Sequence, residues 1–215
     1  MSEAPNSAGT RLNTLLAEEG QAPLDATQTQ SFEEQLSLFL RWNARINLTA
    51  IRDEDGILKR HFVESIACAR ALPAAIETLL DFGSGAGFPG IPIALCRPEI
   101  AVTLAESQGK KAAFLHEAIR VLGVTTKVHS GRAETLTEEF DCVTLRAVDK
   151  MERAVQSAAK LVRPGGWLAL MTTTASLPVL KSAAGAAFTW DPELQLPCRD
   201  DRLLALGRRA INSPS

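Results

Sequence analysis

An apolar run leads into a loop with glycines at alternate positions in residues 79–90: Leu79-Leu80-Asp81-Phe82-Gly83-Ser84-Gly85-Ala86-Gly87-Phe88-Pro89-Gly90. The apolar run predicts a buried strand, and Pro89 suits the first turn of a following helix. Glycine permits positive φ and close approach of the backbone to a ligand, but it costs conformational entropy on folding. Four glycines within eight residues therefore indicate a ligand-binding loop rather than a bare turn.

The order of these glycines indicates the kind of ligand. Dinucleotide-binding folds carry G-x-G-x-x-G, in which a helix N-terminus receives a pyrophosphate. Here the order is D-x-G-x-G-x-G, which favours S-adenosylmethionine, a ligand without phosphate whose methionine and ribose pass beside the loop. We expect contacts from Gly83, Gly85 and Gly87, and we expect Asp81 to position the ligand directly or through water.

An acidic residue ends the next predicted strand. Residues 101–106 predict that strand, and Glu106 follows Gly83 by 23 residues. An acid about 20 residues beyond the glycine loop typically accepts hydrogen bonds from ribose hydroxyls. The alternative role is a helix N-cap, which Ser107 can fill instead, so the ribose role is favoured.

A third ligand contact is expected after the following strand, in the sequence Gly131-Arg132-Ala133-Glu134. In such folds this position lines the adenine pocket, where a backbone N–H and a nearby acid read the base edge. Glu134 fits a first-turn helix acid that interacts with the helix dipole equally well.

Strands and helices alternate from residue 78 onward. The predicted strands are 78–82, 101–106, 124–129, 140–145 and 166–172, and the predicted helices are 89–96, 108–122, 133–137 and 149–162. This alternation predicts a parallel, doubly wound sheet with right-handed crossovers. Two further strands, 188–194 and 202–209, complete an α/β fold: a Rossmann-like, seven-stranded class I methyltransferase sheet, mostly parallel, whose last strand pair is antiparallel.

The region before the sheet carries helical periodicity and no strand signal. Helices are predicted over 27–46 and 57–72, with a shorter helical stretch before them. Three segments are therefore expected: a disordered N-terminus (1–9), a helical cap (10–75) and a methyltransferase domain (76–215).

The fourth strand delivers Arg146 to the carboxyl edge of the sheet, where ligands bind in open α/β sheets. The sequence Leu145-Arg146-Ala147-Val148 lacks the Asn/Asp-Pro-Pro-Tyr/Phe motif common in enzymes that methylate exocyclic amines. It also lacks the cysteine nucleophile of cytosine C5 enzymes. The edge therefore favours an acceptor that needs neither a base nor a nucleophile.

Guanine N7 is such an acceptor, because its lone pair lies in the ring plane and can attack a sulfonium methyl directly. The work left to the enzyme is alignment. Arg146 is the candidate catalytic residue, binding a phosphate or the guanine O6. The alternative is a surface arginine paired with an acid such as Asp149.

Composition bounds the class of protein. The chain has 215 residues, of which 46% are hydrophobic and 22% charged, as in globular domains. Its formal net charge of −2 gives no global basic field, so a nucleic-acid partner requires a local basic face. The four cysteines are too widely spaced for a metal clip, and no metal is expected. Without a membrane-length apolar run or a signal peptide, a cytoplasmic protein is expected.

Three motifs resemble those of a known family. Residues 42–49 are similar to W-N-x-x-I-N-L-T, residues 60–65 to R-H-F-x-[DE]-S, and residues 83–92 to G-S-G-A-G-F-P-G-I-P. By these motifs the chain resembles the 16S rRNA (guanine-N7) methyltransferases, the RsmG or glucose-inhibited division protein B family. The resemblance runs from about Phe39 to Gly166 and more loosely to Arg209.

This resemblance implies S-adenosylmethionine as the methyl donor and an N7-methylguanosine in the decoding-region loop of small-subunit rRNA as the product. Together with the motifs, it gives the residues expected to bind the donor: Asp81, Gly83, Gly85, Gly87, Phe88, Glu106, Ala133, Glu134 and Arg146. By the same resemblance, the N-terminal segment lies across the mouth of this site, with Asn43, Asn47, Arg60 and His61.

Basic residues near this mouth are expected to contact RNA: Arg41, Arg45, Arg60, His61 and Lys110. The alternatives are a structural role for His61 and a solvated basic patch at Lys110. The expected partner is 16S rRNA or the 30S particle, with no DNA or membrane, and the chain is expected to act as a monomer.

Two positions depart from the family pattern. Leu145 stands where the family usually has serine, and Thr172-Thr173-Thr174 follows Met171 where it usually has Lys-Gly.

Three rival functions remain: an NAD-dependent oxidoreductase, a non-enzymatic RNA-binding factor with a relict fold, and a small-molecule methyltransferase. The absence of tyrosine counts against a Tyr-Lys reductase, and the intact glycine loop against a relict.

Overall fold

The computed structural model describes residues 7–211 and contains one mixed β-sheet. Its strands are β1 (Thr78–Phe82), β2 (Ala101–Ala105), β3 (Thr126–His129), β4 (Phe140–Arg146), β5 (Val162–Thr173), β6 (Phe188–Trp190), β7 (Leu194–Gln195) and β8 (Arg202–Arg209). The order is β3-β2-β1-β4-β5-β8-β6, with β7 paired to β8. Strands β1 to β5 are parallel, and β8 runs antiparallel to both β5 and β6. The predicted class I methyltransferase sheet is confirmed.

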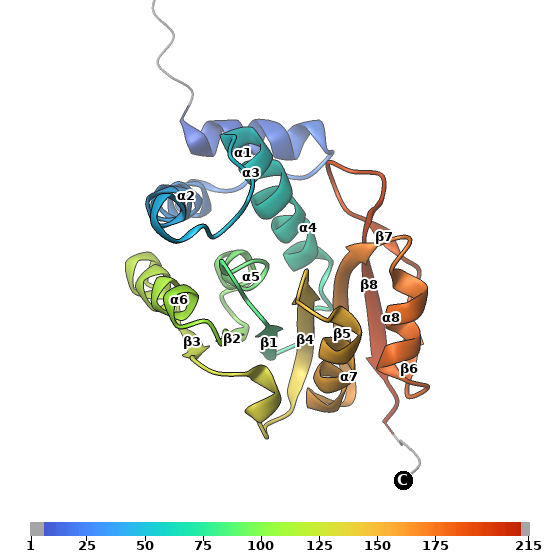
Figure 1. Cartoon of the computed structure of the whole chain (residues 1–215). Helices are drawn as coiled ribbons and strands as arrows, with labels where there is room; N and C mark the ends of the chain where they lie inside the picture. Colours follow the sequence, from blue (N-terminus) through green and yellow to red (C-terminus); the bar gives the residue numbers. More distant parts are fainter. Residues whose placement is uncertain (1–6, 212–215) are drawn as a thin grey trace, which may run out of the picture.

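Helices cover both faces of this sheet (Figure 1). They are α1 (Ala8–Glu18), α2 (Ala26–Ile46), α3 (Glu54–Ile57), the π-helical turn η1 (Leu58–Val63), α4 (Glu64–Ala71), α5 (Gly90–Cys96), α6 (Gly109–Leu122), the 3₁₀ turn η2 (Ala133–Thr135), α7 (Met151–Leu161) and α8 (Leu177–Ala184). Helices α5 and α6 lie on one face, with α2 and α4 packed against them, while α7 packs on β4 and β5 from the other face.

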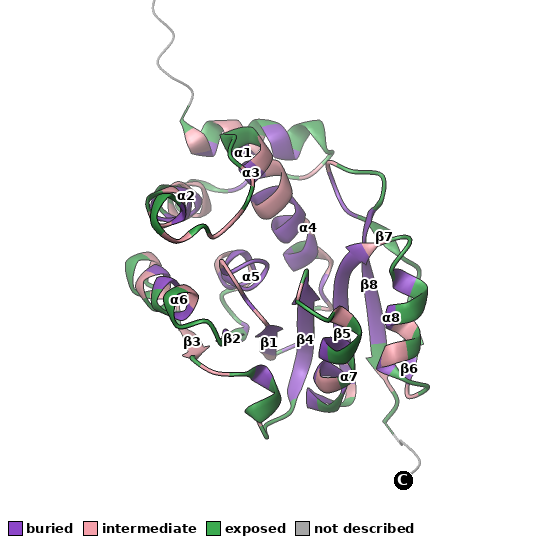
Figure 2. Ribbon diagram, viewed as in Figure 1, coloured by how far each residue is buried: buried purple, intermediate pink, exposed green. Residues whose placement is uncertain are grey.

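The N-terminal helices share an apolar core with the sheet. Leu12 of α1, Phe39 of α2 and Ile66 of α4 belong to the same buried cluster as Leu79 of β1 and Leu104 of β2. Figure 2 shows the result: strands β4, β5 and β8 and the inward faces of the helices are buried, and the outer face of α6 is exposed. The N-terminal helices therefore form an additional layer on the α5–α6 side.

Capping residues fix where the N-terminal helices begin and end. The Ser7 side chain accepts a hydrogen bond from the Thr10 amide, so α1 starts at Ala8. Residues 8 and 9, expected to be disordered, are therefore helical, because their helix end is capped. Residues 1–6 lie outside the described part of the chain. Asp25 and Gln28 form a capping box for α2, which ends at Asn47 in the left-handed conformation.

Several predicted boundaries need correction. Strand β5 begins at Val162 rather than 166, because Val162 pairs with Phe140. The predicted strand 188–194 is two short strands, since only its ends pair with β8. The predicted helix 133–137 is a single 3₁₀ turn. Helix α8 was not predicted, although its buried Leu177, Leu180 and Ala184 are spaced helically. No helix among residues 7–211 is both long and apolar enough to cross a membrane.

Candidate active site

The carboxyl ends of four parallel strands form a cleft. Strands β1 and β4 are neighbours in the sheet. From β1 the chain continues outward to β2 and β3 on one side, and it then crosses back to β4 and β5 on the other side. This reversal of strand order is where open α/β sheets bind ligands. Two adjoining cavities lie there, of about 310 and 360 Å³. They share Gly83, Glu106 and Val148 in their walls, and together they follow the strand ends.

The glycine loop after β1 forms one wall through two of its glycines. Gly83 and Gly85 line the cavities with φ of +73° and +56°, which glycine adopts without strain. A Cβ at Gly83 would lie 3.0 Å from a methyl carbon of Val148, so a side chain there would crowd the wall. Gly87 lines neither cavity. A Cβ there would lie 2.4 Å from Ile91, so this glycine serves the packing of α5.

Asp81 lies beneath the loop rather than in a cavity. Its carboxylate accepts hydrogen bonds from the Gly90 amide (3.1 Å) and the Thr144 hydroxyl (2.9 Å) and is almost fully buried. Burial raises the pKa of this carboxyl to about 6. The structure thus gives Asp81 contacts that fix the start of α5 to β4, and it does not bring the residue to the cavity walls.

Glu106, which directly follows β2, stands between the two cavities. Its Oε2 accepts from the Gly85 amide (2.9 Å) and its Oε1 from the Gln108 amide (2.7 Å). Each carboxylate oxygen has two acceptor positions, so each retains one for a ligand. These two backbone bonds hold the carboxylate at the wall that the two cavities share, where its remaining acceptor positions are available to two adjacent hydroxyls.

Residues after β3 line the larger cavity. Ala133 is buried in the turn η2, and Glu134 lies beside it at the wall. The Glu134 carboxylate pairs with the exposed Arg132 at 3.1 Å. The position after β3 therefore faces the cleft, as predicted from the motif.

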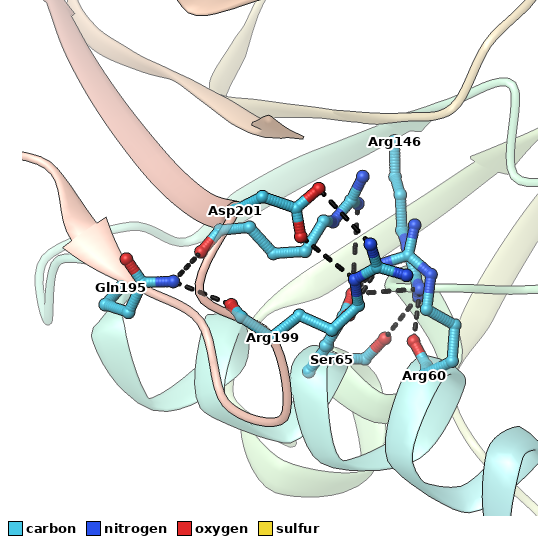
Figure 3. Close-up of polar contacts among 8 residues, drawn as sticks. Arg60, Ser65, Arg146, Gln195, Arg199 and Asp201 are labelled. Carbon is cyan, nitrogen blue, oxygen red and sulfur yellow. Dashed lines mark hydrogen bonds and ion pairs between the residues drawn. The ribbon is translucent and has the colours of Figure 1, made fainter. Parts of the chain in front are cut away.

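Arg146 ends β4 at the wall of the smaller cavity and is nearly buried, with 8% of its surface exposed. Its guanidinium donates to Glu64 Oε2 (3.1 Å). It also donates to Ser65 Oγ (3.3 Å) and to the carbonyl of Arg60, as Figure 3 shows. The alternative of a surface arginine paired with Asp149 is therefore wrong, because the partner is a carboxylate from the N-terminal helices. Burial lowers the pKa of Arg146 to about 10, which leaves it protonated at neutral pH.

Glu64 is completely buried and has three arginines around it. Arg60 donates to both its oxygens, at 2.5 and 2.6 Å, and Arg202 at the start of β8 lies 3.9 Å away. The three guanidiniums come from three separate parts of the chain, η1, β4 and β8. This cluster, Glu64 with Arg60, Arg146 and Arg202, is called the arginine cluster below. It contains two more positive than negative charges.

His61 is a wall residue of the smaller cavity. Its ring stacks on Phe88 at 5.0 Å between centroids, and its Nε2 lies 2.9 Å from the Thr49 hydroxyl. Burial, with the charges of Arg146 and Arg60, lowers the pKa of His61 to about 3. The imidazole is therefore neutral at physiological pH and carries no charge toward a phosphate.

The structure separates the predicted residues into two groups. The residues that line the cavities are Gly83, Gly85, Phe88, Glu106, Ala133, Glu134, Arg146 and His61. The residues that do not are Asp81, Gly87, Arg41, Arg45, Arg60 and Lys110. Arg41 and Arg45 are exposed on α2, and the neighbour of Lys110, Lys111, lines the wall instead.

The N-terminal segment reaches the mouth of the site through Leu48 and His61. Asn43 is buried and accepts from the Thr49 amide (2.9 Å), which shapes this turn, and Asn47 accepts from Arg52.

Two members of the arginine cluster were missed by sequence reasoning. Glu64 lies in the motif at residues 60–65 but was given no role, although a charged residue between Val63 and Ile66 signals a buried partner. Arg202 is the first residue of β8 and is followed by an apolar run, which is a weaker signal of the same kind. Neither signal identifies the partner.

Comparisons with known proteins show which family this sequence resembles. A sequence model of the family described as rRNA small subunit methyltransferase G matches residues 28–188. Ribosomal RNA small subunit methyltransferase G of Roseiflexus sp. (strain RS-1) is 44% identical over 150 residues, and that of Stenotrophomonas maltophilia (strain K279a) is 42% identical over 170. The alignments cover 66% of this chain and 64% of the first relative, and 78% of each for the second.

Solved structures share the fold at low sequence identity. A methyltransferase of Pyrococcus furiosus has a TM-score of 0.61 and 14% identity, covering 84% of this chain and all of that one. An O-methyltransferase of Bacillus cereus, solved in complex with SAH, has a TM-score of 0.58 and 16% identity, with 92% and 100% covered.

Proposed function

The chain belongs to the rRNA small subunit methyltransferase G family, and from this premise we propose that it transfers a methyl group from S-adenosylmethionine to N7 of a guanine in 16S rRNA. The chain spans about 64% of the length of the first relative, so activity, substrate and partners are proposed here for the chain itself. The observation that carries the proposal is the cleft in which Glu106, the glycine loop and Arg146 line one continuous wall.

The residues that line the cleft fit S-adenosylmethionine. The free acceptor positions of Glu106 suit the vicinal hydroxyls of its ribose, and the wall at Ala133 and Glu134 suits its adenine. The backbone at Gly83 and Gly85 can approach the methionine portion closely, because no Cβ intervenes. When bound, this donor supplies the methyl group on a sulfonium; the protein supplies the orientation.

The same loop disfavours a dinucleotide. A pyrophosphate needs free amides at a helix N-terminus. Here the Gly90 amide donates to Asp81, and the amides of Gly87 and Phe88 donate to the Ser84 carbonyl. With these donors occupied by the protein, the NAD-dependent alternative lacks its main anchoring site.

Guanine N7 is favoured as the acceptor by the groups around it. His61 has a pKa of about 3 and is too weak a base to take a proton from an amine or hydroxyl at neutral pH. A ring nitrogen with a free lone pair needs no such base, so alignment is sufficient. We propose that Glu64 and Ser65 fix the position of the Arg146 guanidinium at this end of the cleft, and that the guanidinium donates a hydrogen bond to the guanine O6.

We further propose that the substrate is 16S rRNA within or on its way to the 30S particle, that the protein acts as a cytoplasmic monomer, and that the RNA meets a local basic face. Several basic residues surround the strand ends: Lys111, Lys150, Arg153 and Arg202. Such a face can attract phosphates although the formal net charge of the chain is −2. Arg41, Arg45 and Lys110 are exposed and remain candidates for further phosphate contacts.

The test is methylation of unmodified small subunits with labelled S-adenosylmethionine, followed by mapping of the labelled base by mass spectrometry. We expect label on one guanine as N7-methylguanosine. Label on an exocyclic amine, or only on small molecules, would contradict the proposal. Arg146→Gln is expected to lower kcat more than it weakens binding of S-adenosylhomocysteine, and equal turnover would remove Arg146 from the active site.

A further inference from the structure

A third cavity adjoins the donor cleft on its β5 side. It has a volume of about 480 Å³ and lies between the end of β5 and the starts of α7 and α8. Its lining combines basic and hydroxyl-bearing residues with one carboxylate and an apolar side. The basic and hydroxyl-bearing residues are Lys150, Arg153, Thr172, Thr173, Ser176 and Arg202, the carboxylate is Glu152, and the apolar side includes Met151, Met171, Val179 and Leu180. Ala147 belongs to both this cavity and the smaller cavity of the donor cleft, so the two meet next to Arg146.

Arg202 is a lining residue of this cavity, and part of its guanidinium is buried without a hydrogen-bond partner in the described residues. Only 8% of the residue is exposed, yet its Nε and Nη2 have no hydrogen-bond partner within residues 7–211. Its nearest carboxylate oxygen, Oε2 of Glu64, is 3.9 Å from Nη2, too far for a hydrogen bond. Buried donors without acceptors are costly and uncommon in native proteins, and a bound water or ion is one way in which they are satisfied.

The rest of the arginine cluster cannot take that role as readily. Arg146 already donates to Glu64, Ser65 and the Arg60 carbonyl, and Arg60 holds both oxygens of Glu64. The Glu64 carboxylate therefore accepts hydrogen bonds from two of the guanidiniums, those of Arg60 and Arg146. The third guanidinium, that of Arg202, has no carboxylate within hydrogen-bond distance. An additional anion at this point would reduce the excess positive charge of the cluster and could accept the hydrogen bonds that Arg202 leaves unmade.

We propose that Arg202 and this third cavity bind a backbone phosphate of the RNA strand next to the acceptor nucleotide. A guanidinium presents paired N–H groups that match phosphate oxygens, and Lys150, Arg153 and the hydroxyls of Thr173 and Ser176 surround the same space. Contacts of these residue types to phosphates set the register of a nucleic acid without reading its sequence. Arg202 thus orients the strand, while the acceptor base enters beside Arg146. The inference rests on the proposed function.

The test compares Arg202→Gln and Arg202→Lys with the wild-type protein and with Arg208→Gln. Arg208 is a matched control, because it is exposed at the other end of β8 and donates to the Gly165 carbonyl. Equilibrium binding and methylation of unmodified 30S particles are measured over a range of salt concentrations. Calorimetric titration with S-adenosylhomocysteine reports the donor site and the fold.

Arg202→Gln is expected to raise Kd and KM for the particles about tenfold or more with unchanged affinity for S-adenosylhomocysteine. Loss of one phosphate contact should also reduce the slope of log K against log salt by about 0.7 to 0.9. Arg202→Lys should recover the slope but only part of the affinity, because it keeps the charge without the paired donors. Wild-type Kd and slope in Arg202→Gln, or a parallel loss of S-adenosylhomocysteine binding, would overturn the inference.

A second measurement uses the wild-type protein and does not depend on the variants folding. Guanosine 3′-monophosphate, guanosine and inorganic phosphate are compared as competitors of particle binding. The nucleotide should compete at a concentration at least about tenfold lower than either of the others. Equal competition by guanosine and its phosphate would overturn the site, and equal competition by inorganic phosphate would overturn its assignment to the RNA strand. Because particle binding requires no turnover, a protein that binds the particles through Arg202 but methylates no N7 would contradict only the proposed function.

Discussion

At the scale of single residues, Glu106 both supports the backbone of the glycine loop and lines the cleft. It braces the glycine loop through the amides of Gly85 and Gln108, and it faces the cleft with its remaining acceptor positions. A change at this residue therefore affects both the shape of the loop and the acceptors available to a ligand.

Replacing Glu106 with glutamine is expected to weaken binding of S-adenosylhomocysteine by about 10- to 100-fold. A hydrogen bond to a charged group contributes about 1.5–3 kcal/mol, and the amide can no longer accept at both ends. Calorimetric titration measures the effect. Glu99→Gln, at an exposed position before β2, is the control and should bind normally. Normal binding by Glu106→Gln would exclude the ribose role.

Because the pKa of His61 is lowered in the folded protein, we expect the free energy of unfolding to fall at acid pH. Its pKa is about 3 in the folded protein, lowered from 6.5 by burial and then by Arg146 and Arg60. The unfolded chain thus takes up the proton first, so this contribution to stability is complete above pH 6.5 and is lost as the pH falls toward 3. One proton corresponds to about 1.4 kcal/mol per pH unit at most.

Denaturant unfolding of His61→Gln between pH 7 and pH 4 tests this. The variant should show a shallower decline of unfolding free energy with falling pH than the wild type. Asp81, whose pKa is raised to about 6, acts with the opposite sign but is present in both proteins and cancels in the difference. His116→Gln changes an exposed imidazole on α6 and serves as the control. Parallel curves for His61→Gln and the wild type would contradict the prediction.

At the scale of elements, α2 connects the N-terminal layer to the donor cleft through aromatic rings. Phe39 of α2 lies edge-on to Phe88, at 5.7 Å, and to Phe114 of α6, at 6.4 Å. Phe88 lines the smaller cavity, and Trp42 one turn further along α2 donates to Glu117 of α6 at 3.1 Å. The position of the loop residue Phe88 therefore depends on α2.

Phe39→Ala is expected to lower the free energy of unfolding by about 3–5 kcal/mol, because it removes a fully buried ring from this cluster. Denaturant unfolding measures the loss. Ser37→Ala, at an exposed position on the same helix, should remain within about 0.5 kcal/mol of the wild type. A loss below about 1 kcal/mol for Phe39→Ala would show that the ring is not packed as described.

At the scale of the whole molecule, the helices before β1 and the sheet are packed around one shared apolar core. Their apolar side chains share one cluster, from Leu12 on α1 to Leu206 on β8. Neither part can open without exposing the buried face of the other. Equilibrium unfolding should therefore occur in one transition.

Tryptophan fluorescence can test this, because the tryptophans lie in both parts. A variant that retains only Trp42, on α2, and one that retains only Trp167, on β5, report the two parts separately. We expect each probe to give the same denaturant midpoint as circular dichroism of the same variant. A lower midpoint from Trp42 than from circular dichroism would show that the N-terminal layer unfolds on its own.

The sheet and the donor cleft follow from local patterns. The strands β1 and β8 have the predicted bounds, and the loop at Gly83, the acid at Glu106 and the turn at Ala133 meet at one edge. This was predictable because parallel strands bring all their carboxyl ends to the same edge, whatever the intervening helices contain. Helix α8 and the split of 188–194 were missed, because short elements are defined by their pairing and packing partners more than by their own sequence.

By itself, the sequence determined the alternation of strands β1 to β5 with helices, the glycine loop and the acid beside it, since each is a pattern within a few residues or at a fixed spacing. Tertiary structure alone determined that the Asp81 carboxylate is bonded to Gly90 and Thr144 and does not line the cleft, and that Arg146 is held by Glu64, 82 residues away. It also left Arg202 as the guanidinium without a bonded anion. The physical reason is that the partner of a buried charge is set by which distant segments the apolar core brings together, and no local spacing encodes that choice.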